Sequence, residues 1–495
     1  MTATSVSSSR VGRGMLDVIA ERAERWALPV ILLIAGLNFF WQLGSSSYFI
    51  DEAFSVIHSL PSFHTMFHVI GHVETSPYAY FLFLHEWIIR TGSQAEWVTR
   101  LPSAVAGVLL VAAIYWMARA FVARRVALGA AALTAISPLI QVYAQETRVY
   151  VFLMLAVVVA VGASVRATQR TERQMPLLML AAAASFLAIW LHYTAFSVVL
   201  PLAIWVATRS ELSRRARVIF VGTCLAGLGT VLPVLLEQYH YYPKLVPIAG
   251  AINGQNLVSV IGTPFGTRIG TPVNARTIIG ALVIVASLAV LSVPHGRQAR
   301  QRILLVALCA VGVVGLIGVD LTGKQLLITR YTAVVAPFMV TAIAVACWRL
   351  PRPGAAALAI AAVAISAIGL ADNHSTSGFY PPARQVVDYI APRQHPGDFM
   401  LTPGFPLTDT ALFYYVTRRT HPKLHFLGLD DPAQHVIFRK YKRIWLVPNP
   451  PVATDAAALK FVEPLLRKYH YRAVSVAVFN ASVPLGVILA ESERR

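Results

Sequence analysis

The sequence predicts an α-helical polytopic membrane protein with a small α/β domain after its last apolar segment. Three observations support this class: 56% of the 495 residues are hydrophobic, only 13% are charged, and apolar stretches recur along most of the chain. A soluble domain carries about 25% charged residues, whereas roughly 17–25 apolar residues in a helix cross a bilayer. An ordinary soluble protein is therefore excluded.

About eleven apolar stretches are expected to span the membrane, at 27–43, 101–118, 126–141, 149–165, 175–191, 194–208, 218–236, 277–293, 303–319, 332–348 and 354–371. With the N-terminus inside, the cytoplasmic pieces hold 19 Arg, no Lys and five acids, whereas the opposite loops hold eight basic and eight acidic residues. This asymmetry is the positive-inside pattern. The net charge of +19 is therefore mostly a signal of topology, and nucleic acid is not needed to explain it.

The same topology divides the chain into three parts. Residues 1–26 form a cytoplasmic tail, residues 27–371 a transmembrane module, and residues 372–495 a domain outside the cytoplasm. The first outer loop, residues 44–100, is too long for a simple connection and predicts short amphipathic helices. In the last part, β-branched segments such as RIWLVPN and YRAVSVAVF alternate with helix-like ones, which is typical of an α/β domain.

The stretch FIDEAFS places Asp51 and Glu52 side by side at the outer edge of the first span. One interpretation is that Asp51 only caps the next helix. A chemical role is favoured by further polar residues in the same loop, which are His72, Glu74 and Arg100. His72 and Glu74 are weak candidates for a divalent metal, because zinc or calcium sites normally use three or more protein ligands. No metal is assigned on this basis.

A second polar group follows the third span, in SPLIQVYAQETRVY, and contains Tyr143, Gln145, Glu146 and Arg148. Charged residues this close to a span are functional candidates, because burying them without partners is costly. The alternative is that Glu146 and Arg148 pair with each other or extend toward the interface.

Two later segments place polar side chains at outer ends of spans. His192 lies in LHYTAF, and Lys324, Arg330 and Tyr331 lie in LTGKQLLITRYTAVVAP. Arginine can bind phosphate oxygens in a bidentate way, although either cation could equally anchor a lipid headgroup and His192 could be a packed boundary residue. Because all these groups face one side of the membrane, the pattern predicts group transfer from a membrane-bound phosphate ester.

Five motifs, in the order YFIDEAFS, HVETSPYAYF, RLPSAVAG, SPLIQVYAQETRVY and TRYTAVVAP, resemble integral-membrane glycosyltransferases of the GT-C class. Within that class the chain is similar to the protein O-mannosyltransferase and aminoarabinose-transferase relatives, called glycosyltransferase family 39. The resemblance covers roughly the first 350 residues. It implies an inverting transfer of a sugar, with mannose as a candidate, from a polyprenyl-phosphate carrier to a protein, glycolipid or polysaccharide acceptor outside the cytoplasm.

The resemblance also implies roles for individual residues. Asp51 would be the catalytic base and Glu52 its acidic neighbour, while Arg148, Arg330, Tyr331 and Lys324 would bind the donor phosphate. The expected substrate-binding residues are His72, Glu74, Arg100, Tyr143, Gln145, Glu146 and His192. The chain departs from the family where SPYAY replaces a PPLYY-type run, so the resemblance does not indicate which sugar or acceptor is used.

The alternative function is a flippase or transporter for lipid-linked saccharides, and a third is a membrane sensor whose C-terminal part is the working domain. Transporters usually place polar groups near the bilayer midplane and often contain internal repeats. Here the span interiors are nearly free of charge and the polar residues gather at the outer edge. That distribution favours the enzyme.

Overall fold

The computed structural model describes residues 25–241, 252–266, 274–293, 299–321, 328–375, 381–402, 406–428, 434–448, 453–481 and 484–494. Most of the predicted cytoplasmic tail, and Lys324, lie outside the described residues. The chain divides into two compact units, each built from separate stretches of sequence. The first contains the chain up to Trp41, Phe67–Tyr80 and Leu101–Asp372, and the second contains Gln42–Met66, Phe81–Arg100 and Asn373–Arg495.

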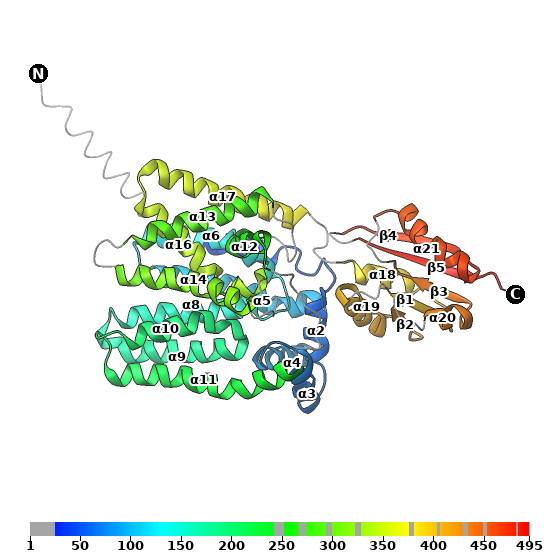
Figure 1. The fold of residues 1–495 in the computed structure, drawn as a ribbon, viewed down its shortest axis with the longest axis horizontal. Coiled ribbons are helices and arrows are strands. Elements are labelled where there is room, and N and C mark those ends of the chain that lie inside the picture. Colours follow the sequence, from blue (N-terminus) through cyan, green and yellow to red (C-terminus); the bar gives the residue numbers. More distant parts are fainter. Residues whose placement is uncertain are drawn as a thin grey trace, which may run out of the picture. The chain divides into compact units, whose positions relative to one another are not determined.

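Helices dominate the first unit (Figure 1), and most of the long ones are apolar. Within the described ranges, eight elements are long and apolar enough to cross a membrane: α5 (Glu96–Ala118), α8 (Tyr150–Ala167), α9 (Gln174–Leu191), α11 (Arg214–Tyr241), α13 (Ala275–Ser292), α14 (Ala299–Asp320), the run Thr329–Arg349 and α17 (Arg352–Ser375). That run consists of α15 (Thr329–Thr332), η5 (Ala333–Val335) and α16 (Ala336–Arg349). A ninth candidate is a bent pair, α6 (Arg124–Ala135) with α7 (Pro138–Ala144).

All eleven predicted stretches coincide with helices, and the polytopic helical class is confirmed. Length and composition, however, support eight or nine spans in the described part of the chain. The two others, Arg25–Phe40 and Tyr193–Ala207, are apolar but shorter than the rest. At 1.5 Å per residue, the second of these extends about 22 Å, which is less than the ~30 Å of a hydrocarbon core.

Two helices form the centre of the first unit. In α8 and in the run containing α16, 78% and 89% of the residues in the apolar window are buried. Helix α8 packs against α9, which also contacts α11, and α16 packs against α6 and α13. A Cβ atom at Gly162 of α8 would lie 2.5 Å from Cζ3 of Trp116, so glycine permits a close approach between α8 and α5. The packing of these helices fixes the helix ends at which the predicted polar site residues lie.

The first outer loop contains three helices, as its sequence predicts. They are α2 (Ile50–His58), α3 (Phe63–Val73) and α4 (Ala79–Thr91). The remaining short elements are η1 (Thr171–Arg173), η2 (Tyr193–Ala195), α10 (Phe196–Ala207), α12 (Gly254–Ile261) and η4 (Thr263–Phe265).

The C-terminal part of the second unit contains a five-stranded mixed sheet with strand order β2-β1-β3-β5-β4. Its strands are β1 (Phe399–Thr402), β2 (His425–Gly428), β3 (Arg443–Leu446), β4 (Tyr471–Phe479) and β5 (Leu485–Ser492). Strand β1 pairs in parallel with β2 and β3, whereas β5 is antiparallel to β3 and β4. The helices are α18 (Ala383–Ile390), α19 (Pro406–Arg419), α20 (Gln434–Lys440) and α21 (Asp455–Tyr469), so the predicted α/β domain is confirmed.

Successive side chains of each strand point to opposite faces of the sheet, and helices pack against both faces. Phe399 and Leu401 of β1 share a buried cluster with Phe438 of α20 and Val462 of α21. The side chains that alternate with these along the strands point to the opposite face of the sheet. There the Trp445 ring of β3 meets Tyr389 of α18, with 6.4 Å between ring centroids.

Candidate active site

The acidic pair lies in the first turn of α2, in the second unit. Helix α2 begins at Ile50, and the Phe49 N–H donates a hydrogen bond of 3.0 Å to Glu52 Oε2. The Ser55 hydroxyl donates to the Asp51 backbone carbonyl at 2.8 Å. Carboxylates are stabilised near a helix N-terminus, because the backbone N–H groups of the first turn point toward them. Glu52 is fully buried, whereas Asp51 is only half-buried.

Glu52 and Arg100 form a bidentate ion pair inside this unit. Arg100 Nε donates to Glu52 Oε1 and Arg100 Nη2 donates to Glu52 Oε2, both at 2.8 Å. The pair is almost completely removed from solvent, with 0% exposure for Glu52 and 1% for Arg100. Planar bidentate geometry of this kind is strong and orientationally specific. The two side chains therefore join the first turn of α2 to α5.

A break between α6 and α7 positions the second polar group, which lies in the first unit. Pro138 has no N–H to continue a helix and disfavours helical geometry at the residue before it. Helix α6 therefore ends at Ala135, and α7 restarts at Pro138 with an axis bent by 61°. The Ser137 hydroxyl donates to the Pro264 carbonyl at 2.8 Å, which fixes the break against η4. Helix α7 then carries Tyr143 to its C-terminal end.

Four rings from four parts of the first unit form a continuous aromatic row. The Tyr143 and Tyr150 centroids lie 4.7 Å apart, those of Tyr150 and His192 lie 5.5 Å apart, and those of His192 and Tyr331 lie 5.9 Å apart. All four residues are buried. The row joins α7, the start of α8, the end of α9 and α15, which are distant in sequence.

Two guanidinium groups flank this row. Arg148 Cζ lies 5.9 Å from the Tyr150 ring centroid, and Arg330 Cζ lies 5.9 Å from that of Tyr331. Burial, with smaller contributions from the positive charges of Arg148 and Arg330, lowers the pKa of His192 to about 3. Both arginines therefore act electrostatically on one imidazole, which is neutral at physiological pH.

The position of His192 is set by its backbone role. It ends α9 and precedes η2, and its Nδ1 accepts the Thr194 N–H at 3.2 Å. The Thr194 hydroxyl lies 2.9 Å from the same nitrogen. Because Nδ1 accepts, the proton of the neutral ring is on Nε2. The residue is thus a fixed hydrogen-bond donor within the aromatic row.

An apolar cavity of about 500 Å³ begins at the same row. His192 and Tyr331 contribute to its wall, and the remainder is mostly apolar side chains of α10, α11 and α14, such as Leu200, Leu235 and Leu316. Tyr193 closes part of the wall through a 2.7 Å hydrogen bond from its hydroxyl to Gln238 Oε1. The wall of the cavity therefore includes the His192 ring, on which Arg148 and Arg330 act, and is otherwise lined mostly by apolar side chains.

The other predicted site residues lie apart from the row or serve other contacts. Gln145 Nε2 donates to the carbonyls at the end of the first helix, most closely to Trp41 at 2.7 Å, so Gln145 caps that helix. His72 Nδ1 lies 2.6 Å from the His68 carbonyl, and its ring packs 4.1 Å from that of Tyr241. Glu146 is buried close to Arg148 in sequence, and Glu74 is half-buried. Among the described residues, no group of three or more His, Cys, Asp or Glu side chains could hold a metal ion.

Of the predicted residues, the structure therefore brings together Tyr143, Arg148, His192, Arg330 and Tyr331. Sequence reasoning missed Gln238 in the cavity wall, and it noted Tyr193 only as the neighbour of His192 in LHYTAF. Tyr193 adjoins His192 in sequence, and Gln238 is a polar residue in the last turns of an apolar helix, so both carried a readable signal.

The arrangement of these helices belongs to a known class of membrane fold, that of the GT-C glycosyltransferases. A family model described as dolichyl-phosphate-mannose-protein mannosyltransferase matches residues 78–236. A search of curated proteins by sequence gives no match.

Solved structures with this fold include ArnT from Cupriavidus metallidurans in the apo state, at 12% identity and a TM-score of 0.59, with 95% of this chain and 98% of ArnT covered. AglB, an archaeal oligosaccharyltransferase from Archaeoglobus fulgidus, has 12% identity and a TM-score of 0.51, with 96% and 75% covered. The arabinofuranosyltransferase AftD from Mycobacteria has 15% identity and a TM-score of 0.51, with 96% and 40% covered. The predicted fold class is thereby confirmed.

Proposed function

We propose that this chain is a glycosyltransferase that moves a sugar, with mannose as the first candidate, from a polyprenyl-phosphate carrier to an acceptor outside the cytoplasm. Two solved relatives support a lipid-phosphate ligand: ArnT was crystallised with undecaprenyl phosphate, and AglB was determined with a dolichol-phosphate and an inhibitory peptide. The matching family model names a dolichyl-phosphate-mannose donor. The acceptor is a protein, a glycolipid or a polysaccharide.

The observation that carries this proposal is the cavity that starts at His192 and Tyr331, beside Arg148 and Arg330. A polyprenyl-phosphate sugar has a long apolar chain and an anionic head. The apolar walls suit the chain, because burying each methylene group stabilises the complex by about 0.8 kcal/mol. Guanidinium groups suit the phosphate, because they donate paired hydrogen bonds to its oxygens.

The proposed reaction is a single displacement with inversion. The acceptor oxygen forms a bond to the anomeric carbon of the sugar while the bond from that carbon to the phosphate oxygen breaks. Asp51 takes the proton of the acceptor hydroxyl. The departing polyprenyl phosphate gains negative charge as it leaves, and Arg148 and Arg330 stabilise that charge in the transition state. The mechanism requires the Asp51 carboxylate to reach an acceptor bound next to the donor.

Glu52 has a different role in this mechanism. Its two oxygens accept three hydrogen bonds, from Arg100 and from the Phe49 backbone. Both oxygens are therefore already engaged by donors of the protein itself. We assign the proton transfer to Asp51 alone and regard Glu52 and Arg100 as residues that keep the first turn of α2 in place.

The proposed orientation has the N-terminus in the cytoplasm and the C-terminal domain outside it, at the cell membrane. It is supported by the 19 arginines and absence of lysines in the predicted cytoplasmic pieces. A single cysteine in place of Arg494, labelled in intact cells with a membrane-impermeant maleimide, tests this orientation. Labelling only after the membrane is opened would contradict it.

The experiment that tests the function uses the purified full-length protein in lipid nanodiscs. It is incubated with a panel of polyprenyl-phosphate sugars and with peptide, glycolipid and polysaccharide acceptors, and products are detected by mass spectrometry. We expect an acceptor heavier by one sugar, together with free polyprenyl phosphate. Movement of labelled lipid-linked saccharide between vesicle leaflets, without any product, would instead support a flippase.

A further inference from the structure

Residues 43–49, which lead into α2, have an irregular backbone whose polar groups are bonded by side chains. We call them the 43–49 segment. Arg100 Nη1 donates to the Leu43 and Ser46 carbonyls at 3.0 and 3.1 Å, and Arg100 Nη2 donates to the Ser47 carbonyl at 3.0 Å. Buried backbone groups need such partners, because an unsatisfied group costs roughly 1–3 kcal/mol. The position of the segment is thus determined by its side-chain partners.

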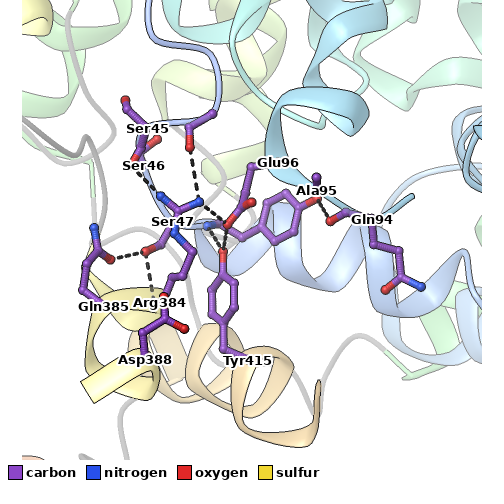
Figure 2. Close-up of polar contacts among 12 residues, drawn as sticks. Ser45, Ser46, Ser47, Gln94, Ala95, Glu96, Arg384, Gln385, Asp388 and Tyr415 are labelled. Atoms are coloured by element: carbon purple, nitrogen blue, oxygen red, sulfur yellow. Dashed lines mark hydrogen bonds and ion pairs between the residues drawn. The ribbon is translucent and has the colours of Figure 1, made fainter. Parts of the chain in front are cut away.

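A second set of partners comes from α18 of the C-terminal domain, within the same compact unit (Figure 2). Arg384 Nη1 donates to the Gly44 carbonyl at 3.2 Å, and Arg384 Nη2 donates to the Ser45 carbonyl at 2.8 Å. The Arg384 N–H donates to Ser47 Oγ at 3.1 Å, and that hydroxyl donates to Gln385 Oε1 at 2.8 Å. One turn of α18 therefore contacts three residues of the segment.

A third set comes from α19, through the hydroxyl of Tyr415 (Figure 2). It accepts the Tyr48 N–H at 2.8 Å and donates to Glu96 Oε1 at 2.6 Å. Arg384 Nη1 also contacts Glu96 Oε1, at 2.9 Å. Burial, together with the neighbouring Glu96, raises the pKa of Tyr415, so its phenol remains a donor at physiological pH. Tyr48, Glu96 and Tyr415 are all buried.

The residues held by these contacts lie only a few positions before the first turn of α2, which carries Asp51 and Glu52. Tyr48, which Tyr415 holds, directly precedes Phe49, whose N–H bonds to Glu52 in the first turn of α2. Helix α19 also packs against α2 itself. A displacement of α18 or α19 therefore moves the backbone that carries Asp51, because the residue that Tyr415 holds, Tyr48, lies only three positions before it.

We propose that Glu96, Arg384 and Tyr415 are positioning residues through which the C-terminal domain sets the location of the Asp51 carboxylate, an inference that rests on the proposed function. The domain then contributes to the chemical step without touching either substrate. Misplacing a reacting group by about 1 Å can slow a reaction about 100-fold. Donor binding is assigned to residues of the other unit and is unaffected.

The kinetic test uses Tyr415→Phe, which removes one hydroxyl and retains the ring, and Arg384→Gln. We expect kcat to fall about 10- to 100-fold in both, with the donor KM changed less than about 2-fold. Arg384→Lys should restore only part of the rate, since an ammonium cannot donate in the geometry of a guanidinium fork. The control is Arg467→Gln, because Arg467 forms an exposed i,i+4 pair with Glu463 on α21 of the same domain.

A second measurement does not depend on activity. Hydrogen exchange followed by mass spectrometry reports on peptides that cover residues 43–52 in folded protein. We expect faster exchange of this region in Tyr415→Phe and Arg384→Gln, and wild-type exchange in Arg467→Gln. Wild-type exchange and wild-type kcat in both variants would overturn the inference. If the wild-type protein were inactive with every donor, the proposed function would be overturned. The exchange data would still show whether the positioning contacts hold residues 43–52 in place.

Discussion

Arg100 in the second unit and Arg330 in the first both lie near aromatic rings, with Cζ 5.6 Å from the Tyr48 centroid and 5.9 Å from the Tyr331 centroid. Their surroundings differ. Arg100 is 1% exposed and bonds to a carboxylate and several backbone carbonyls. Arg330 is half-buried and, with Arg148, acts on a neutral histidine at the wall of a cavity. A guanidinium bonded throughout to its own chain stabilises structure, whereas two like charges beside a cavity favour an anionic ligand.

The largest effect is expected for Asp51, which belongs to the same helix turn as the Arg100 network but is assigned the chemistry. Asp51→Asn should lower kcat by about 10²- to 10⁴-fold, because an amide cannot accept the proton of the acceptor hydroxyl. Product formation from a radiolabelled polyprenyl-phosphate sugar measures it, with protein amount checked in the same membranes. Full activity in this variant would remove Asp51 from the mechanism.

Disruption of the buried pair should affect stability first. Glu52→Gln leaves the Arg100 charge buried without its carboxylate, which costs about 3–5 kcal/mol. Chemical unfolding in detergent measures the loss. The double variant Glu52→Gln/Arg100→Met should be less destabilised than the sum of the single variants, since it removes both charges. Strict additivity would show that the two residues do not stabilise the fold as a pair.

In the first unit, Arg330→Gln should act on the donor and leave the fold intact. Loss of a charge-assisted hydrogen bond costs roughly 1.5–3 kcal/mol, which corresponds to a 10- to 100-fold loss of kcat/KM for the donor. Arg90→Gln is a suitable control, because Arg90 forms only an exposed i,i+4 pair with Glu86. Equal donor kinetics in the two variants would show that Arg330 does not bind the donor phosphate.

The smallest effect is expected from filling the cavity. Gly315 lines it, and a Cβ atom there would meet nothing within 4 Å, so Gly315→Leu projects into open space. Excluding about two methylene groups of the lipid costs roughly 1.6 kcal/mol, or about 10-fold in KM for a long-chain donor. A short-chain donor should be affected less. Gly318→Leu is the control on the same helix, since it also meets open space and does not line the cavity.

The two arginines near His192 show how much of the candidate site the sequence motifs predict. The sequence predicts that Arg148 and Arg330 act together because one follows the third span and the other precedes the tenth, on one side of the membrane, and the structure brings both to His192. Lys324 was grouped with them, and it lies outside the described residues. Gln145 was grouped with them as well, yet its amide caps the first helix. Residues three positions apart in a turn can face different neighbours, and spacing alone does not distinguish them.

The first turn of α2 shows more clearly what the sequence cannot predict about the role of a residue. Asp51 and Glu52 are equivalent candidates in the sequence, since both are carboxylates at the start of one helix. Their different environments follow from Arg100, which is 48 residues away from Glu52. Tyr415 and Arg384 gave no signal in the sequence, because tyrosine and arginine are common surface residues of α/β domains.

The sequence alone determined that the chain is a polytopic membrane protein, where its helices lie and which residues could carry chemistry, because hydropathy and charge order are properties of the chain read in one dimension. The tertiary structure decided which of those charges bond within the protein and which flank a cavity. That choice depends on groups hundreds of residues apart, such as the Tyr48 N–H and the Tyr415 hydroxyl, and only burial in a folded unit makes their hydrogen bond strong enough to fix a position.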